Sequence, residues 1–230
     1  MKYKWLFFDL DNTILDFDKG MVDALNKTIA DYDIPKNENH LAIYSAINKK
    51  CWEDFEKKII TQDRLRTLRM ERFLNHINSD ASPVNFSESY HRNLGSVIYY
   101  LENAEALIKE WSKEYKMILA TNGLKDVQRS RLSLTDLPKY FEAIVISDEI
   151  GVAKPYKGFF DYAFEQIGHP PKEEVLMIGD SLSSDIAGGN RYGIDTCWLD
   201  QKGKAIPEHN QPTYVIKVLE ELKDVLRVGS

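Results

Sequence analysis

Cysteine is scarce in this sequence: the 230 residues contain only Cys51 and Cys197, which lie far apart along the chain. No CxxC pair occurs, the five histidines are scattered, and neither an HExxH motif nor another zinc-type Cys/His spacing is present. The sequence therefore argues against a disulfide-stabilised secreted scaffold and against a zinc site. We expect both cysteines to be reduced core residues and the protein to be cytoplasmic.

Long hydrophobic runs are also missing. No apolar stretch approaches the roughly 20 residues of a membrane-spanning helix, and Asp9 interrupts the N-terminal apolar run too early for a signal peptide. An excess of positive charge is lacking too, because 30 Lys and Arg residues against 36 Asp and Glu residues give a net charge of −6. We therefore expect no membrane and no nucleic-acid partner, and no feature marks an obligate protein partner.

The sequence does contain short apolar runs that alternate with helical patterns. Five runs show almost no polar alternation, which is typical of strands buried on both faces: 3–11, 115–123, 141–149, 174–181 and 194–200. Helical patterns occupy 102–114, 124–137, 157–168, 184–193 and 217–226. This alternation predicts an α/β fold with a Rossmann-like, doubly wound parallel sheet.

One long stretch breaks the alternation, because no convincing strand occurs between Asp16 and Leu101. Four segments in it carry apolar residues at helical spacing: 18–32, 38–59, 61–77 and 87–101. Thr61 and Ser87 stand where N-cap residues are expected. We predict a helical cap at residues 16–101, inserted after the first strand as a lid, on a core formed by residues 1–15 and 102–230. A bundle that merely enlarges the core is the alternative.

Polar residues follow four of the predicted strands. They are Asp9 and Asp11 after the first, Thr121, Asn122 and Gly123 after the second, Lys154 after the third, and Asp180 and Asp185 after the fourth. In open parallel sheets, ligands bind beyond the carboxyl ends of the strands, where the strand order reverses. We therefore expect these four groups to converge on one small volume.

Asp9 and Asp11 are unusual because two carboxylates this close resist joint ionisation. A structural turn is one interpretation. A calcium loop of the EF-hand type does not fit, since Ile14 stands where glycine is required and Gly20 where glutamate is required. An aspartate at a rigid strand end can instead be a nucleophile that forms an acyl phosphate, and a carboxyl group two residues later can serve as acid and then base.

Asp180 follows a strand that we expect beside the first, so it would add a third carboxylate to the same cleft. Three carboxylates require a cation, and oxygen ligands without His or Cys favour Mg²⁺ over zinc. In this interpretation the divalent ion relieves the repulsion between Asp9 and Asp11. The serines that follow, Ser183 or Ser184, are expected to cap the next helix.

Thr121 and Lys154 each resemble an ordinary turn or surface residue when taken alone. At the same sheet edge as the carboxylates they offer a hydroxyl donor and a fixed positive charge. Together with backbone N–H groups at a helix start, these are the groups that bind a phosphate.

Four motifs, DLDNT, ATNG, AKP and GDSLSSDIAGG, resemble in order and spacing the signature motifs of the haloacid dehalogenase (HAD) superfamily. The resemblance covers about residues 3–15 and 103–200, and the insertion is similar to the helical C1-type cap of that superfamily. At finer grain, KKCWEDFEKKIITQDRLRTLRMERF, VISDEIGVAKP and TCWL are similar to the bacterial pyrimidine 5′-nucleotidase branch. This implies a Mg²⁺-dependent phosphatase that acts on a nucleoside 5′-monophosphate or a similar small-molecule phosphate ester.

The resemblance also implies roles for the carboxylates. Asp9 would be the nucleophile that forms an aspartyl-phosphate, and Asp11 would protonate the leaving alcohol and then activate water. The carboxylates of Asp9 and Asp180 and the main-chain carbonyl of Asp11 would bind Mg²⁺.

The remaining motif residues would bind the phosphate and set its charge. Thr121 would hydrogen-bond the phosphoryl oxygens, with the backbone of Asn122 nearby. Lys154 would balance the charge on Asp9 and on the phosphate, and Asp185 would order either magnesium-bound water or Lys154.

Other functions on the same core stay open. A sugar-phosphate phosphatase or phosphomutase needs the same core residues and differs in its cap. A 2-haloacid dehalogenase typically lacks Asp11 and Asp180, which are present here. A phosphonate-cleaving relative needs a desolvated cap lysine, and nothing marks Lys49 or Lys50 as one. A non-catalytic binding protein would usually have lost the nucleophile.

The insertion also carries aromatic residues at helical spacing. We expect most of them, among Tyr44, Phe55 and Tyr99, to form the bundle core, while Trp52 or Phe17 is the best candidate to stack on a base. Four arginines in the segment 61–77 spread around the predicted helix, and an acidic residue lies among them. We interpret them as a solvated face of the helix and not as a nucleic-acid groove. These arginines are Arg64, Arg66, Arg69 and Arg72.

Overall fold

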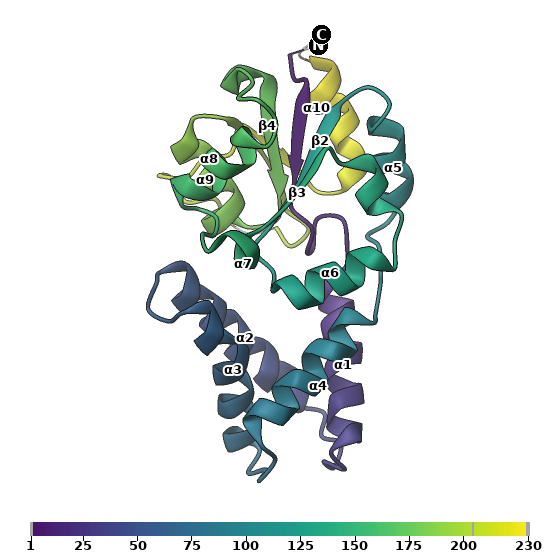
Figure 1. Cartoon of the computed structure of the whole chain (residues 1–230), viewed down its shortest axis with the longest axis vertical. Coiled ribbons are helices and arrows are strands. Elements are labelled where there is room, and N and C mark those ends of the chain that lie inside the picture. The colour runs from purple at the N-terminus through teal and green to yellow at the C-terminus, as the bar shows by residue number, and fades with distance from the viewer. Residues whose placement is uncertain (1, 204, 229–230) are drawn as a thin grey trace.

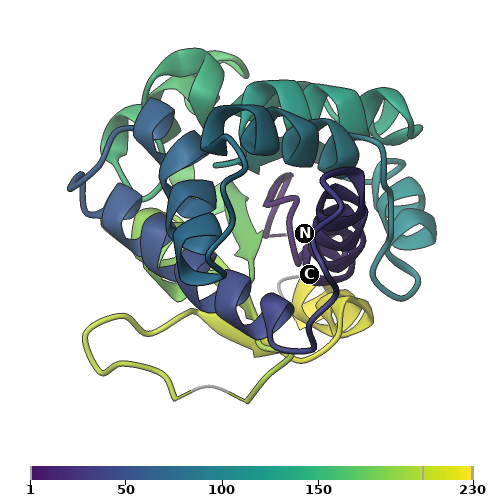
Figure 2. The same ribbon diagram turned by 90° about the horizontal axis from the view of Figure 1, so that it is seen from below.

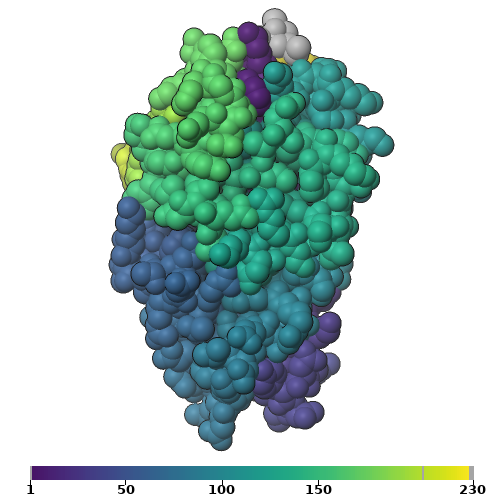
Figure 3. All heavy atoms as spheres, in the orientation of Figure 1, coloured from purple at the N-terminus to yellow at the C-terminus, as the bar shows by residue number. Residues whose placement is uncertain are grey.

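The computed structural model describes residues 2–203 and 205–228. A six-stranded sheet with helices on both faces forms the upper part of the molecule in Figure 1, and helices α1 to α4 form the lower part. The two parts are in contact in the space-filling view (Figure 3). The beginning and the end of the described part of the chain lie at the end of the molecule that is remote from the four helices (Figure 1).

The sheet is parallel throughout, with the strand order β3-β2-β1-β4-β5-β6. Its strands are β1 (Trp5–Phe8), β2 (Lys116–Thr121), β3 (Ala143–Ile146), β4 (Val175–Gly179), β5 (Asp195–Leu199) and β6 (Tyr214–Ile216). This confirms the predicted fold class and adds β6, which the sequence reading did not include. β1 lies between β2 and β4, so the strand order reverses at β1, which is the position where such sheets bind ligands.

Both faces of the central strand are buried. Leu6 and Phe8 pack into one hydrophobic cluster with α5 (Ala104–Trp111) and α10 (Leu222–Val228). Trp5 and Phe7 pack into a second cluster with α8 (Lys157–Glu165) and α9 (Ala187–Tyr192), which cover the other face (Figure 1). Burial on both sides explains why the strand is a continuous apolar run in the sequence.

Shorter elements complete the core. They are α6 (Lys125–Ser133), α7 (Ser147–Ile150), 3₁₀ turns at Leu137–Tyr140, Lys172–Glu174 and Leu219–Glu221, and a π-helical turn at Leu182–Ile186. The cap of the π-helical turn is Ser181, whose side chain accepts a hydrogen bond from the Ser184 N–H at 3.2 Å. The prediction of Ser183 or Ser184 as the cap was therefore wrong, because the chain is still extended at Ser181 and turns directly after it.

The inserted helices are α1 (Phe17–Asp31), α2 (His40–Glu56), α3 (Gln62–His76) and α4 (Pro83–Gly95). α1 packs on α4, α2 on α3, and α4 on both α3 and α6. They enclose a hydrophobic cluster that includes Met21, Leu25, Tyr44 and Phe73, so Tyr44 is a core residue as expected. Seen from below, the four helices lie in front of the sheet (Figure 2).

Two N-cap predictions had different outcomes. Thr61 caps α3 and accepts a hydrogen bond from the Arg64 N–H at 3.2 Å, which confirms the expectation. Ser87 does not cap α4, because the helix begins four residues earlier with Ser82 as its cap. The missed signal is Pro83, whose fixed φ and missing N–H suit the first turn of a helix.

The arginines of α3 do not form one solvated face. Arg64 and Arg72 are largely exposed, but Arg66 is only 22% exposed at its side chain and Arg69 is buried. Arg69 can be buried because Asn48 and His91 accept hydrogen bonds from its guanidinium group. The solvated-face interpretation was therefore wrong for Arg69 and incomplete for Arg66.

Both cysteines are buried and free, as expected. Among the described helices, none combines the length and the apolar character that a membrane span requires.

Candidate active site

A cavity of about 180 Å³ lies at the carboxyl end of β1, between the sheet and the inserted helices. Asp9, the residue that follows β1, is tied to the neighbouring strand by a hydrogen bond from its N–H to the carbonyl of Ile178 at 2.9 Å. The seven residues that were predicted to have catalytic, phosphate-binding or metal-binding roles all line this cavity. They are Asp9, Asp11, Thr121, Asn122, Lys154, Asp180 and Asp185.

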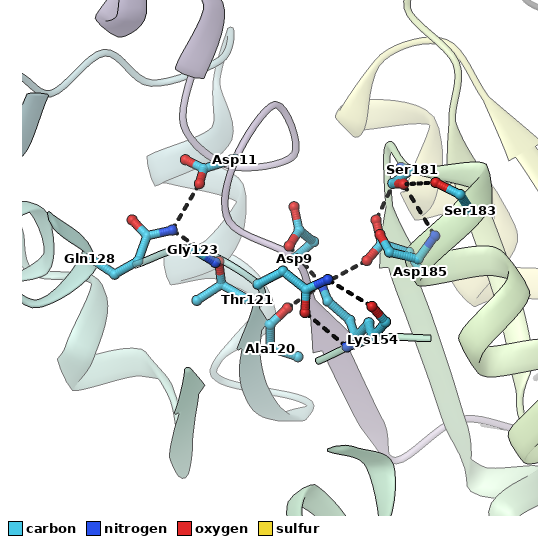
Figure 4. Close-up of polar contacts among 12 residues, drawn as sticks. Asp9, Asp11, Ala120, Thr121, Gly123, Gln128, Lys154, Ser181, Ser183 and Asp185 are labelled. Atoms are coloured by element: carbon cyan, nitrogen blue, oxygen red, sulfur yellow. Dashed lines mark hydrogen bonds and ion pairs between the residues drawn. The ribbon is translucent and has the colours of Figure 1, made fainter. Parts of the chain in front are cut away.

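Lys154 lies at the centre of the site and is 1% exposed. Its Nζ donates to Oδ1 of Asp9 and to Oδ1 of Asp185, each at 2.7 Å, and also to the carbonyl of Ala120 (Figure 4). Burial by itself disfavours the ammonium form, but the carboxylates of Asp185 and Asp9 outweigh it, so the pKa of Lys154 lies above its ordinary value. Lys154 is therefore a fixed positive charge.

Asn122 holds the Lys154 backbone in place. Its side-chain amide donates to the carbonyl of Lys154 and its side-chain oxygen accepts from the Lys154 N–H, both at 2.9 Å. From the sequence, only the backbone of Asn122 was expected to lie near the phosphate. The paired hydrogen bonds show that its side chain connects the end of β2 to the segment that carries the buried lysine.

Three carboxylates come together at this edge of the sheet. Oxygen atoms of Asp9, Asp180 and Asp185 lie within 4.8 Å of one another, and Asp9 and Asp185 are buried. Burial raises the pKa of Asp9 well above its usual range. The positive charge of Lys154 acts to lower this pKa, and the negative charges of the neighbouring carboxylates act to raise it further. With Lys154 included, the formal net charge of the cluster is −2. A divalent cation would balance that charge.

Gly179 lets Asp185 approach the end of β4. A Cβ atom at this glycine would lie 2.2 Å from Oδ2 of Asp185, closer than any real contact allows. The same Oδ2 accepts a hydrogen bond from the Ser181 N–H at 3.0 Å, and Oδ1 is bound to Lys154. The glycine therefore leaves the space that the Asp185 carboxylate occupies.

Asp11 does not join this cluster at its carboxylate. Its Oδ1 lies 2.5 Å from Nη1 of Arg131, and its Oδ2 accepts from Nε2 of Gln128 at 2.8 Å. Figure 4 shows the side chain directed towards Gln128 and away from Asp9. The expectation that a divalent ion relieves the repulsion within the pair needs correction, because Asp9 and Asp11 already have separate buried cations, Lys154 and Arg131.

Gln128 and Arg131 were missed by the sequence reading. They stand three residues apart on α6, so they share one face of the helix, and both are 1% exposed. The signal was available: two long polar side chains with helical spacing directly follow a strand whose end was already suspected to bear a site. Without the packing of α6, their burial was not evident.

Thr121 is oriented by α6 as well. Its Oγ1 accepts from Nε2 of Gln128 at 2.9 Å and from the Gly123 N–H at 3.1 Å. A hydroxyl group has two acceptor lone pairs and one proton. Since both lone pairs are engaged, the Thr121 hydroxyl has its proton to donate to a group in the cavity.

The inserted helices contribute the opposite wall of the cavity. Phe17 of α1 lines it together with Asn48, Trp52 and Glu56, which follow one another at intervals of four residues along α2. Both aromatic candidates for base stacking therefore lie at the cavity. Burial raises the pKa of Glu56.

Comparison with known proteins identifies relatives along nearly the whole chain. The family model described as "Haloacid dehalogenase-like hydrolase" matches residues 6–199. The pyrimidine 5′-nucleotidase YjjG of Escherichia coli is 36% identical, over 98% of this chain and 99% of that protein. The pyrimidine 5′-nucleotidase PynA of Streptococcus pneumoniae is 34% identical, over 98% and 96%. A magnesium-bound crystal structure of the putative HAD-hydrolase YfnB of Bacillus subtilis superposes with a TM-score of 0.93 at 34% identity, over 98% and 99%.

Proposed function

This chain belongs to the haloacid dehalogenase-like hydrolase family, and we propose that it hydrolyses pyrimidine nucleoside 5′-monophosphates through an aspartyl-phosphate on Asp9. The observation that carries the proposal is the buried Asp9 at the end of β1, which is bound to Lys154 and lines a cavity of about 180 Å³ together with the Thr121 hydroxyl group. The names of the relatives from E. coli and S. pneumoniae support the choice of substrate class.

The carboxylate cluster suits Mg²⁺. Its members supply oxygen atoms alone, which is the donor type that this ion prefers, and the YfnB structure is described as magnesium-bound. We assign the ion to the carboxylates of Asp9 and Asp180 and to the main-chain carbonyl of Asp11. When bound there, it would supply positive charge to the phosphoryl oxygens and to the carboxylate cluster.

The first step is attack by a carboxylate oxygen of Asp9 on phosphorus. The bond between phosphorus and the 5′ oxygen breaks, and Asp11 gives its proton to that leaving oxygen, which spares the formation of an alkoxide. Water then attacks the aspartyl-phosphate while Asp11 takes up its proton, and inorganic phosphate leaves with Asp9 restored. In the structure Asp11 is bound to Arg131 and Gln128, so this role requires its side chain to leave them and turn towards the phosphoryl group.

Thr121 binds the phosphoryl group and Lys154 balances its charge during both steps. The Thr121 hydroxyl donates its proton to a phosphoryl oxygen, because its lone pairs are already engaged. The fixed charge of Lys154 balances that of Asp9 and the phosphate, and Asp185 holds the lysine in position.

We assign α1 to α4 to a cap domain, residues 16–101, on a catalytic core of residues 1–15 and 102–230. Residues 1, 204, 229 and 230 of that core lie outside the described residues. One contact between cap and core is Arg66 of α3, which forms ion pairs with Asp126 of α6 at 2.7 Å and with Asp148 of α7 at 2.9 Å. A cap that closes on the cavity would exclude bulk water from the aspartyl-phosphate and would open to release product.

The test is release of inorganic phosphate from UMP in the presence of MgCl₂. We expect EDTA to abolish this activity and added Mg²⁺ to restore it. The substitution Asp9→Asn should reduce the activity to background. Asp63→Asn, which alters an exposed carboxylate of α3, is the matched control and should retain activity. Turnover by a folded Asp9→Asn variant, or turnover that is indifferent to EDTA, would refute the proposed mechanism.

A further inference from the structure

A chain of buried polar residues stands behind the cap wall of the active-site cavity. Asn48 of α2 is 7% exposed, Arg69 of α3 is 2% exposed and His91 of α4 is 6% exposed. Nη1 of Arg69 donates to Oδ1 of Asn48 at 2.8 Å, and Nη2 of Arg69 donates to Nε2 of His91 at 2.7 Å. The guanidinium group also lies over the ring of Tyr90, with 5.6 Å between Cζ and the ring centroid. Arg69 is therefore fixed from three sides.

This arrangement determines which end of the Asn48 amide faces the cavity. A guanidinium group only donates hydrogen bonds, so the atom of Asn48 that contacts Arg69 must be its oxygen. The amide nitrogen is then on the other side. Within the described part of the chain no hydrogen bond uses that nitrogen as donor, and it is not among the unpaired polar atoms that are closed off from solvent. Since Asn48 lines the cavity, its N–H groups are open to the cavity.

The surroundings of this donor are suited to a flat ring. Phe17 and Trp52 line the same cavity, and Trp52 is one helical turn from Asn48 on α2. Trp52 is held in place by Phe55, with a ring-centroid separation of 5.7 Å and an interplanar angle of 82°. A planar ligand that occupies this wall would contact aromatic surface and would meet a hydrogen-bond donor with a fixed direction.

We propose that the Asn48 amide recognises the base of the substrate by donating a hydrogen bond to the carbonyl oxygen at position 2 of a pyrimidine. The inference rests on the proposed function and specifies which residue selects the substrate. Cytosine and uracil differ at position 4, where one carries an amino donor and the other a carbonyl acceptor, but both carry a carbonyl acceptor at position 2. A donor that serves pyrimidines as a class must therefore use the position 2 oxygen.

The diagnostic variant is Asn48→Asp. It keeps the oxygen that Arg69 binds, so the buried guanidinium group stays paired, and it replaces the donor that faces the cavity with an acceptor. An acceptor opposite the base carbonyl is repulsive, and a buried group that loses its partner is costly. We expect kcat/KM for UMP and for CMP to fall by about 10- to 100-fold, mostly through KM.

Ribose 5-phosphate serves as the reference substrate because it carries the same reactive phosphate without a base. Its kcat/KM should change by less than about three-fold in Asn48→Asp, because it has no base for Asn48 to contact. A general effect of the added charge or of altered folding would act on both substrates, so it would cancel in the ratio of kcat/KM for UMP to kcat/KM for ribose 5-phosphate. Asn48→Ala, assayed beside it with thermal unfolding, removes the donor without adding charge and should lower the same ratio. Asn75→Asp, which adds the same charge at an exposed position of α3, should leave the ratio unchanged.

The outcomes separate this inference from the proposed function. An equal loss for UMP and ribose 5-phosphate, or no loss for either, would show that Asn48 does not contact the base. A loss for UMP alone, with CMP unaffected, would exclude the oxygen at position 2. If the wild-type enzyme hydrolyses neither nucleotides nor ribose 5-phosphate, the proposed function fails first. If its kcat/KM for ribose 5-phosphate equals that for UMP, the phosphatase stands and base recognition is refuted.

Discussion

His91 gives the structure a testable dependence on pH. Its ring is buried among the inserted helices, and its Nε2 accepts the hydrogen bond from Arg69, so the imidazole must be neutral at that nitrogen. Burial, and secondarily the positive charge of Arg69, lower the pKa of His91 from its ordinary value of 6.5 to about 3. In the unfolded chain the same residue takes up a proton near its ordinary pKa.

The sign and size of the effect follow from proton linkage. Below pH 6.5 His91 binds a proton in the unfolded state but not in the folded state. The free energy of unfolding therefore falls as the pH falls towards about 3. The contribution of His91 is fully present above the unfolded pKa and declines by up to about 1.4 kcal/mol per pH unit below it. Between pH 8 and pH 5 it amounts to a loss of about 2 kcal/mol.

The measurement compares wild type with His91→Gln by urea unfolding from pH 8 to pH 5. Glutamine can accept the Arg69 hydrogen bond through its amide oxygen but does not titrate, and the carboxylates that titrate in both proteins cancel in the difference. We expect the variant to lose about 2 kcal/mol less than wild type over this range. His76→Gln, at an exposed position of α3, controls for the removal of a histidine. Parallel profiles for wild type and His91→Gln would refute the buried, neutral His91.

Two further substitutions test the geometry of the site and of the cap. Gly179→Ala places a Cβ 2.2 Å from Oδ2 of Asp185, so we expect a loss of about 1–3 kcal/mol of stability and a fall in kcat of at least about ten-fold, measured by thermal unfolding and phosphate release. Gly158→Ala, whose Cβ would meet nothing closer than 3.5 Å, is the control, and equal behaviour of the two variants would contradict the crowding. Arg66→Ala removes two ion pairs that join α3 to α6 and α7, so kcat/KM should fall several-fold while stability changes by no more than about 1 kcal/mol. Arg64→Ala, whose partner lies within α3, should have no such effect, and wild-type kinetics in Arg66→Ala would exclude a role for this contact in cap position.

The sheet could be predicted because its strands obey a simple rule. A parallel strand covered by helices on both faces must be apolar at every position, and Trp5 to Phe8 shows this directly. The same rule brings the residues after each strand to one edge, which is why the motif residues lie in one cavity. β6 was missed because three residues, one of them exposed, do not make a detectable apolar run.

The contacts that orient the site could not be read from the sequence, because they are made between elements. Arg69 and Arg131 have the appearance of surface arginines on amphipathic helices, yet both are buried against partners far along the chain. Gln128 reaches both Asp11 and Thr121, which lie on different strand ends. Helical spacing shows which side chains share a face but not what that face packs against.

The two carboxylates at the end of β1 illustrate how the fold makes an acidic site without destabilising its core. Asp9 and Asp11 turn to opposite sides, and each meets a cation that is 1% exposed, Lys154 in one case and Arg131 in the other. A carboxylate buried without a cation costs far more free energy than one that is paired. The two cations therefore have to be in place before any ligand binds. The formal charge of Asp9, Asp180, Asp185 and Lys154 taken together is −2. Since that charge is carried by oxygen atoms that line the cavity, a divalent ion with a preference for oxygen is the counter-ion that we expect to complete the site.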